Sequence, residues 1–354
     1  MYAGGTIDSE WVAEHDTAET RSQSTVQDYL NWIAKRNGFA GVRSTILALK
    51  DSRQISLSDR KEFADKIVES PANRILLTSG TYLMPEIARP IAKHLLASSF
   101  ANKKRIIITG SLIPMKGFEM SDGGFNLGMS VALLGENKLP VPIVLAVING
   151  QAIPAVNLEK DLTTATFAKD ENNLLGYDDY LIVPAGGTID FQPSDNDALI
   201  PGEESLISYY LRKNVKTVLN PTIAQPILKD SRSLNEEDIK EILEIIQTAK
   251  HDKIIITCGL FRIGELRDRI FEFLQENSKQ LGSKTIIMTG SRLMLCMAGF
   301  SDAPFNLGFA HGMLGILDPG VYVALAGRIY ENNEDPLEHT YTKEELANNL
   351  EQHS

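Results

Sequence analysis

The sequence has few cysteines and a shortage of positive charge. Its 354 residues include two cysteines, Cys258 and Cys296, which can build neither a disulfide scaffold nor a four-cysteine zinc site. Both lie in apolar segments, so we expect two buried core thiols in a reducing cytoplasm. Lys and Arg number 35 against 46 Asp and Glu, a formal net charge of −11. This balance argues against a nucleic-acid partner, which requires a basic surface.

Long apolar runs are also absent. No run reaches the ~18 residues that a bilayer-spanning helix requires, and no basic stretch followed by an apolar run opens the chain. The sequence therefore predicts neither a membrane span nor a secretory signal. Hydrophobic residues make up 43% and charged residues 23%, as in ordinary globular proteins. At roughly 150 residues per domain, the length suggests about two domains.

The chain contains an internal repeat. AGGTID occurs at 3–8 and again, identically, at 185–190, and four more motif pairs follow in the same order at offsets of 179 or 180 residues. These pairs are LKDSR twice, TSGTY with TCGLF, ITGS with MTGS, and SDGGFNLG with SDAPFNLG. The period is too long for a solenoid, so each copy should be a domain with its own core. We place the two domains at residues 1–172 and 179–354.

Each copy alternates short apolar runs with helical patterns. Strands buried on both faces are expected at 74–78, 105–109 and 142–148, and in the second copy at 181–183, 253–257, 284–289 and 321–326. Helices are expected at 58–69, 85–96 and 122–134, and in the second copy at about 235–249, 264–280 and 302–314. Repeated strand–helix–strand units predict an α/β fold of two tandem Rossmann-like three-layer domains with mainly parallel sheets.

Three of the repeated motifs directly follow predicted strands of the first copy. Ligands of such sheets bind outside the carboxyl ends of the strands, where AGGTID, TSGTY and ITGS all fall. We therefore expect the motifs of one copy to meet in space. The first strand has almost no residues before Gly4, so it should be short or completed by residues upstream.

The first candidate for chemistry is the threonine after the glycine pair. Gly4 and Gly5 allow a tight turn and leave the Thr6 hydroxyl beside free backbone N–H groups, which suits a nucleophile with an oxyanion hole. The alternative is a plain glycine-rich turn with the threonine as a cap. The segment is not a phosphate loop, because the pattern GxxxxGK[ST] is absent.

Two other segments supply candidate side chains. In SGTY, Thr81 is a second hydroxyl at a strand end, and Lys160 could be its base if it is desolvated. Otherwise Lys160 is an ordinary surface lysine, and the histidines are surface or packing residues. Ser52 could bind a substrate carboxylate, with Arg53 adding positive charge. The alternative for that segment is an Asx-type turn that opens a helix.

Taken together, these segments resemble the bacterial asparaginase/glutaminase family, specifically its N-terminal domain. The resemblance covers about residues 3–168 and, weakly, 181–345. It rests on segments similar to the family's first-threonine motif (AGGTID), carboxylate-serine segment (DSRQISLSD), second-threonine motif (SGTY), long TG…P…S-DG..NL stretch (TGSLIPMKGFEMSDGGFNLG) and catalytic-lysine segment (NLEKDLTT).

The resemblance implies a reaction and a set of residues. It implies hydrolysis of a side-chain amide, of L-asparagine or a related amide, through an acyl-threonine with release of ammonia and without a metal or organic cofactor. Thr6 is the implied nucleophile, with Thr81 and Lys160 as a second catalytic pair. The residues that would bind the substrate are Gly5, Ser52, Arg53, Gly80 and Tyr82.

Departures from the family pattern leave a second function open. Tyr82 stands where the family has an Asp that binds the substrate's α-ammonium, and residues 9–23 hold no lid tyrosine, with Trp11 the only aromatic. In the second copy, Leu260 and Phe261 replace the threonine and tyrosine, and DPLEHTYT offers only Glu338 and His339 instead of a lysine.

Two hypotheses follow. The first is a cytoplasmic amidohydrolase with a small-molecule amide substrate, active in the first copy. The alternative is a catalytically inactive binding or scaffold protein on the same fold. In both, the second copy is expected to be inactive, and the copies could form an intramolecular pseudo-dimer or the protein a homo-oligomer.

Overall fold

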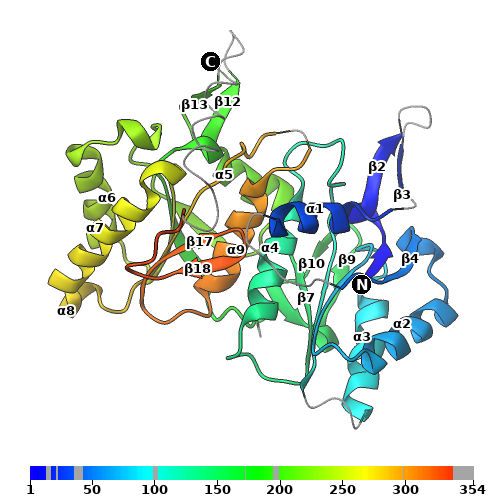
Figure 1. Cartoon of the computed structure of the whole chain (residues 1–354). Coiled ribbons are helices and arrows are strands. Elements are labelled where there is room, and N and C mark those ends of the chain that lie inside the picture. Colours follow the sequence, from blue (N-terminus) through cyan, green and yellow to red (C-terminus); the bar gives the residue numbers. More distant parts are fainter. Residues whose placement is uncertain are drawn as a thin grey trace.

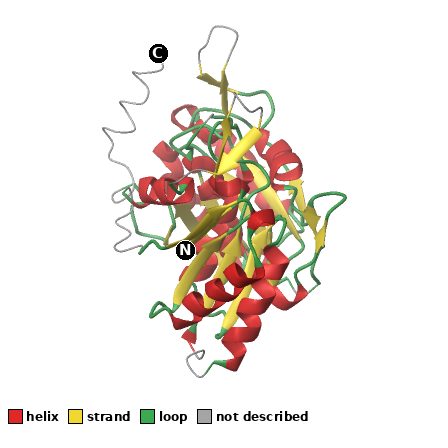
Figure 2. Ribbon diagram, turned by 90° about the vertical axis from the view of Figure 1, so that its right-hand side faces the viewer, coloured by secondary structure: helices red, strands yellow, loops and turns green. Residues whose placement is uncertain are grey.

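The computed structural model describes residues 1–12, 17–20, 23–35, 43–98, 103–171, 173–193, 199–297 and 299–337. The chain forms two mainly parallel six-stranded sheets, one in each repeat, with helices packed on them (Figures 1 and 2). The predicted α/β architecture of two tandem Rossmann-like domains is confirmed.

The first sheet has the strand order β4-β1-β5-β6-β7-β8. Its strands are β1 (Tyr2–Gly4), β4 (Ile46–Lys50), β5 (Arg74–Thr78), β6 (Arg105–Thr109), β7 (Ile143–Ile148) and β8 (Gln151–Pro154). Every neighbouring pair is parallel except β7 and β8. All five residues of β6 are buried, as expected for a central strand covered on both faces. β1 has three residues, so it is as short as the sequence predicts.

The second sheet repeats the first strand for strand, in the order β14-β11-β15-β16-β17-β18. Its strands are β14 (Asn220–Ile223), β11 (Asp179–Pro184), β15 (Lys253–Thr257), β16 (Thr285–Thr289), β17 (Gly320–Leu325) and β18 (Arg328–Tyr330). Again only the last pair is antiparallel. The sequence repeat is therefore a repeat of topology.

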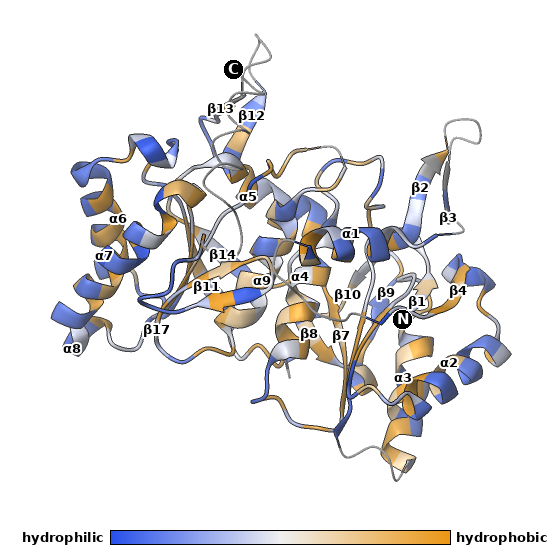
Figure 3. Ribbon diagram, viewed as in Figure 1, coloured by the Kyte–Doolittle hydropathy of each residue, from blue (hydrophilic) through white to orange (hydrophobic). Residues whose placement is uncertain are grey.

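The outer faces of the two sheets are covered by amphipathic helices. These are α2 (Leu57–Glu69) and α3 (Met84–Ala97) on the first sheet, and α6 (Glu236–Thr248) and α7 (Ile263–Glu276) on the second (Figure 1). Figure 3 shows both hydrophilic and hydrophobic residues along these helices, and hydrophobic residues on the strands that they cover. Burying the apolar side of each helix against a sheet stabilises both layers.

Several predicted helix boundaries are wrong, most of them by a single residue. The first outer helix begins at Leu57 rather than Ser58, because Ser56 is its N-cap and forms a capping box with Asp59. The helix predicted at 264–280 ends at Glu276, and a separate short helix, α8 (Ser278–Leu281), follows Asn277.

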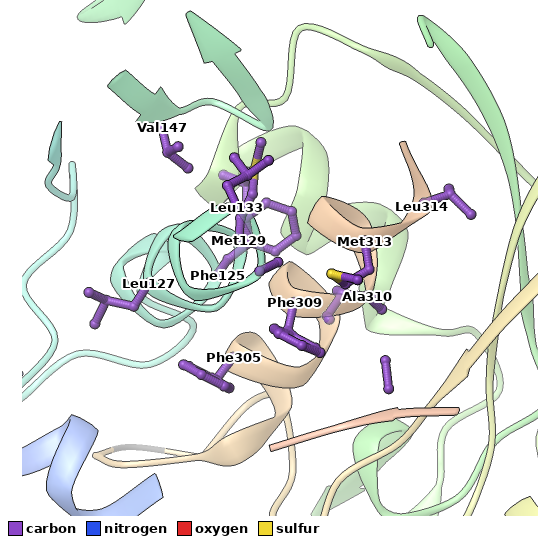
Figure 4. Packing of buried hydrophobic residues seen from close by; sticks show 14 of the residues in the cluster. Phe125, Leu127, Met129, Leu133, Val147, Phe305, Phe309, Ala310, Met313 and Leu314 are labelled. Atoms are coloured by element: carbon purple, nitrogen blue, oxygen red, sulfur yellow. The ribbon is translucent and has the colours of Figure 1, made fainter. Parts of the chain in front are cut away.

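The inner layer is a contact between the two copies. α4 (Asp122–Gly135) and α9 (Asp302–Leu314) pack directly on each other, with their phenylalanines and aliphatic side chains close together (Figure 4). A Cβ on Gly128 would lie 2.0 Å from the carbonyl oxygen of Phe305, and a Cβ on Gly308 would lie 2.0 Å from that of Phe125. Because the two contacts exchange equivalent residues, the helices cross around a pseudo-twofold axis.

Two tyrosine hydrogen bonds repeat this symmetry. Tyr29, on α1 (Thr25–Ala34), donates to the Ser301 carbonyl at 2.8 Å, and Tyr210 donates to the Ser121 carbonyl at 2.9 Å. One hydrophobic core, with side chains from both sheets and from α1, α4 and α9, joins the copies. The two copies therefore pack as an intramolecular pair.

One of the two cysteines fits its prediction, and His311 is a packing residue as predicted. Cys258 is buried as predicted, but the prediction of a core thiol is wrong for Cys296. That thiol is half-buried, because its segment is a loop after β16, where the sulfur lies 3.5 Å from the Phe191 carbonyl oxygen. His311 packs in the interior between the copies and contacts the Gly150 carbonyl at 3.0 Å. Among the described residues, no helix has the length and apolar character needed to cross a bilayer.

Candidate active site

Two glycine turns meet at the carboxyl edge of the first sheet. Gly4, the last residue of β1, and Gly5, which follows it, have φ values of 81° and 90°, which L side chains rarely adopt. A Cβ on Gly5 would lie 2.2 Å from both the nitrogen and the Cα of Gly80, which follows β5. Only glycine permits this approach. It brings the segments that carry Thr6 and Thr81 together, since each threonine directly follows one of the touching glycines.

Ser52 comes from a third strand to the same place. It opens a short 3-10 turn just after β4, the neighbour of β1 in the sheet, and its side chain is buried. A Cβ on Gly80 would lie 2.5 Å from the Ser52 Oγ. Three adjacent strands therefore bring Gly5, Gly80 and Ser52 to one point, as the order of parallel strands predicts.

Lys160 reaches the buried hydroxyl of Thr81. Its Nζ donates a hydrogen bond of 2.8 Å to the Thr81 Oγ1, although 79 residues separate them. The lysine lies on β9 (Lys160–Asp161), which pairs with β10 (Thr166–Phe167), and its Nζ is 5.5 Å from the centre of the Phe167 ring. Burial, with a smaller effect from the nearby Lys216, lowers the pKa of the Lys160 amine. The amine can therefore lose its proton more readily than a solvated lysine.

The SDGGFNLG motif supports the floor of this site. Asp122 accepts hydrogen bonds of 2.9 to 3.0 Å from the backbone N–H groups of Leu112 and Ile113. Asn126 donates from Nδ2 to the Gly110 carbonyl at 2.9 Å. A Cβ on Gly110 would lie 3.2 Å from the Thr81 Cγ2, so this turn lies beneath Thr81. The sequence analysis identified this motif as a repeat and as part of the family resemblance, but assigned no role to Asp122 or Asn126.

Asp8 is a second buried carboxylate that the sequence did not suggest. Its Oδ1 accepts a 2.7 Å hydrogen bond from the Ser24 hydroxyl and a 3.2 Å bond from the Val26 N–H. These bonds fix the turn that begins at Thr6 to the start of α1. Burial raises the pKa of Asp8.

Arg53 and Tyr82 lie at the exposed rim. The Arg53 guanidinium forms a bidentate pair with Asp51, through Nε at 3.0 Å and Nη2 at 2.8 Å, and its side chain is 71% exposed. Tyr82 is 48% exposed. Trp11 lies on β2 (Ser9–Val12), which forms a hairpin with β3 (Thr17–Thr20) after the Thr6 turn (Figure 1).

The second copy has the same glycine contacts but lacks a hydroxyl at the position of Thr81. A Cβ on Gly187 would lie 2.2 Å from the Gly259 nitrogen, and a Cβ on Gly259 would lie 2.3 Å from the Ser231 Oγ. Leu260, which is buried, and Phe261, which is 60% exposed, follow Gly259 in place of Thr81 and Tyr82. Glu338 and His339, at the position of the lysine segment, lie outside the described residues.

The described part of the chain holds no group of three His, Cys, Asp or Glu side chains that could bind a metal ion. The polar groups that the three strands and β9 bring together are the hydroxyls of Ser52 and Thr81, the Lys160 amine and the backbone amides of the glycine turns. Such groups suit nucleophilic and proton-transfer chemistry on an uncharged electrophile.

A family model and solved structures match this chain. The family model "Asparaginase, N-terminal" matches residues 1–177 and again 180–346. No curated protein matches the chain. Among solved structures, L-asparaginase I from Vibrio cholerae O1 biovar eltor str. N16961 matches with 22% identity and a TM-score of 0.36, over 44% of this chain and 47% of that chain. The match thus takes in about half the length of that enzyme. Because the family model covers both repeats, this chain belongs to the asparaginase family, whose N-terminal domain it carries twice.

Proposed function

We propose that the first copy is an asparaginase-like amidohydrolase, which hydrolyses the side-chain amide of L-asparagine or a related linear amide and releases ammonia. The observation that carries this proposal is the 2.8 Å contact between Lys160 Nζ and Thr81 Oγ1 at the edge where the glycine turns meet. An amine with a lowered pKa, bonded to a buried hydroxyl, is a suitable base for acyl transfer.

In the proposed reaction, Thr6 is the nucleophile. Its oxygen attacks the amide carbon, and its proton passes through the Thr81 hydroxyl to the neutral Lys160 amine. Backbone N–H groups of the glycine turns hold the oxyanion. The C–N bond then breaks, and the leaving nitrogen takes the proton back along the same route and departs as ammonia. Water attacks the acyl-threonine in the same way, which frees the carboxylic acid and restores the Thr6 hydroxyl.

The remaining site residues bind the substrate in this proposal. Ser52, with the backbone of Gly5 and Gly80, would hold a carboxylate or another polar group of the amide. Arg53 and Tyr82, at the rim, would contact the part of the substrate farthest from the reacting carbon. A phenol does not attract an ammonium as a carboxylate does, so Tyr82 favours amides without a free α-ammonium.

The alternative function is a binding or scaffold protein without catalysis. The replacements at Leu260 and Phe261 favour it for the second copy, and Tyr82 in place of an acidic residue is the observation that favours it for the first. Under either function, we also propose that the two domains extend over residues 1–172 and 179–354, that the protein assembles into a homo-oligomer and that it is located in the cytoplasm.

Ammonia release separates the two functions. The assay uses asparagine, glutamine and a panel of small blocked amides, with wild-type protein and two matched variants. Thr6→Ala should reduce the rate by about a hundredfold or more, as expected for loss of a nucleophile. Thr188→Ala, the equivalent change in the second copy, should leave the rate unchanged. If no amide gives more ammonia with wild type than with Thr6→Ala, and ligands still raise the melting temperature, the binding function holds instead.

A further inference from the structure

The second copy contacts the strand pair that carries Lys160. Asn149, fully buried in the turn between β7 and β8, makes the connection. Its Nδ2 donates to the carbonyl of Val215 in the second copy at 2.8 Å, and its Oδ1 accepts from the N–H of Phe167 at 3.1 Å. The Val218 N–H donates to the Asn149 carbonyl at 3.1 Å. Since Phe167 is the register partner of Lys160, one amide side chain ties the second copy to the hairpin of the amine.

Lys216 adds a second tie to the same hairpin. It follows the π-helix Tyr210–Val215 of the second copy and adopts a left-handed conformation with φ of 52°. From there its Nζ donates to the Thr164 carbonyl at 3.4 Å, in the loop between β9 and β10. The positive charge of Lys216 thus lies beside the hairpin whose opposite end reaches Thr81.

Other ionisable groups around the Lys160 amine have other partners or lie outside the site. The two sequence neighbours of Lys160, Glu159 and Asp161, are exposed, and Asp161 accepts hydrogen bonds from the Thr163 N–H and the Thr164 hydroxyl. Arg89 of α3 donates to the Leu158 carbonyl at 2.7 Å. Tyr82, next to Thr81, is exposed. Lys216 is the nearby cation that acts on Lys160 electrostatically.

We propose that Lys216, supplied by the inactive copy, is a positioning residue for the amidase site of the first copy. It holds the lysine hairpin through Thr164, and its positive charge favours the neutral form of the Lys160 amine that takes the proton. This inference rests on the proposed function of the first copy for its role in catalysis. The effect of the Lys216 charge on the ionisation of Lys160 can be measured without any substrate.

The first test measures the ionisation of Lys160 directly. The protein is acetylated with acetic anhydride over a range of pH, and mass spectrometry follows the peptide that contains Lys160. Only the neutral amine reacts, so the labelling curve gives its pKa. Two partly exposed like charges near each other shift a pKa by about half a unit at low salt. Lys216→Met should therefore move the curve to higher pH by about half a unit, and added salt should reduce the difference between the two proteins.

Two controls isolate the charge. Lys216→Arg keeps the positive charge and should leave the curve where wild type has it. Lys213→Met removes an exposed lysine of the same π-helix and should also leave it unchanged. Identical labelling curves for wild type and Lys216→Met would overturn the proposal, even if the variant were less stable.

The second test uses the reaction. The rate of a Lys160 base rises with pH as the amine loses its proton, so Lys216→Met should move the acidic limb of the kcat/KM profile to higher pH by the same half unit or so. A lower rate with an unmoved limb contradicts the proposal, because it shows a structural effect only. If wild type releases no ammonia from any amide, the proposed function fails, while the labelling curve still decides the role of Lys216.

Discussion

The crossing of α4 and α9 makes a strong prediction about stability. In Gly128→Ala the new methyl carbon would lie 2.0 Å from the Phe305 carbonyl oxygen, well inside van der Waals contact, and both groups belong to rigid helices. The two helices must therefore move apart, which loosens the core that joins the copies. Overpacking of this kind costs typically 1–3 kcal/mol or more, whereas Ala gains about 1 kcal/mol over Gly in a helix interior. Because the clashing atoms at Gly128 are backbone atoms that cannot rotate away, the overpacking cost should reach the upper end of that range, about 3 kcal/mol, and leave a net loss of about 2 kcal/mol.

Two other glycines provide controls: the equivalent glycine in α9, and a glycine of α4 that has no close neighbours. Gly308→Ala should cost the same about 2 kcal/mol, because its Cβ would lie 2.0 Å from the Phe125 carbonyl oxygen. Gly135→Ala, at the end of α4 with nothing within 4 Å, should be neutral or slightly stabilising. Urea unfolding measures all three through the midpoint at constant m-value. If Gly128→Ala and Gly308→Ala both stay within about 0.5 kcal/mol of wild type, the reciprocal crossing is wrong.

Two further predictions concern pH and substrate binding. Burial lowers the pKa of His311 to about 4. As pH falls, the imidazole is therefore protonated in the unfolded chain before it is protonated in the folded protein. The free energy of unfolding should decrease by about 3 kcal/mol in all as pH falls from the pKa of the unfolded chain toward 4. His311→Gln should not show this decrease. Comparing the melting temperatures of the variant and wild type from pH 8 to pH 4 cancels the contributions of other groups. If the two plots of melting temperature against pH are parallel, His311 is not the group responsible. Ser52→Ala should raise KM for the best amide about tenfold or more, as for a lost hydrogen bond to a charged group, whereas Ser231→Ala should not; equal KM values for both variants would place the substrate elsewhere.

Much of the fold can be predicted from the sequence because two patterns can be read from it directly. The Ile- and Val-rich runs, such as the one at β6, predict strands, and the nearly constant offset of the repeats predicts two copies of one topology. The rule that ligands bind at the carboxyl ends of parallel strands correctly brings Gly5 and Gly80 together. For Lys160, the residues alone left a base for Thr81 and a surface lysine as alternatives, and the family resemblance favoured the first, since no periodicity of the sequence links residues 79 positions apart.

What the sequence did not reveal depends on contacts between the copies. The α4 segment is buried on nearly every side, a sign of a helix enclosed between two layers, but the partner that covers it lies 180 residues away. Asn149 and Lys216 belong to no motif and act only through the packing of one copy on the other. Asp8 was visible within AGGTID, yet its bond to Ser24 depends on where α1 begins.

The most direct test of the proposed chemistry asks which hydroxyl carries the acyl group. Wild-type protein turning over its best amide is quenched in acid, and mass spectrometry locates any acyl adduct on the digested peptides. The proposed mechanism predicts an adduct on Thr6, absent from Thr6→Ala and increased when hydrolysis of the intermediate is slowed. An adduct on Thr81, or steady ammonia release by Thr6→Ala, would contradict it.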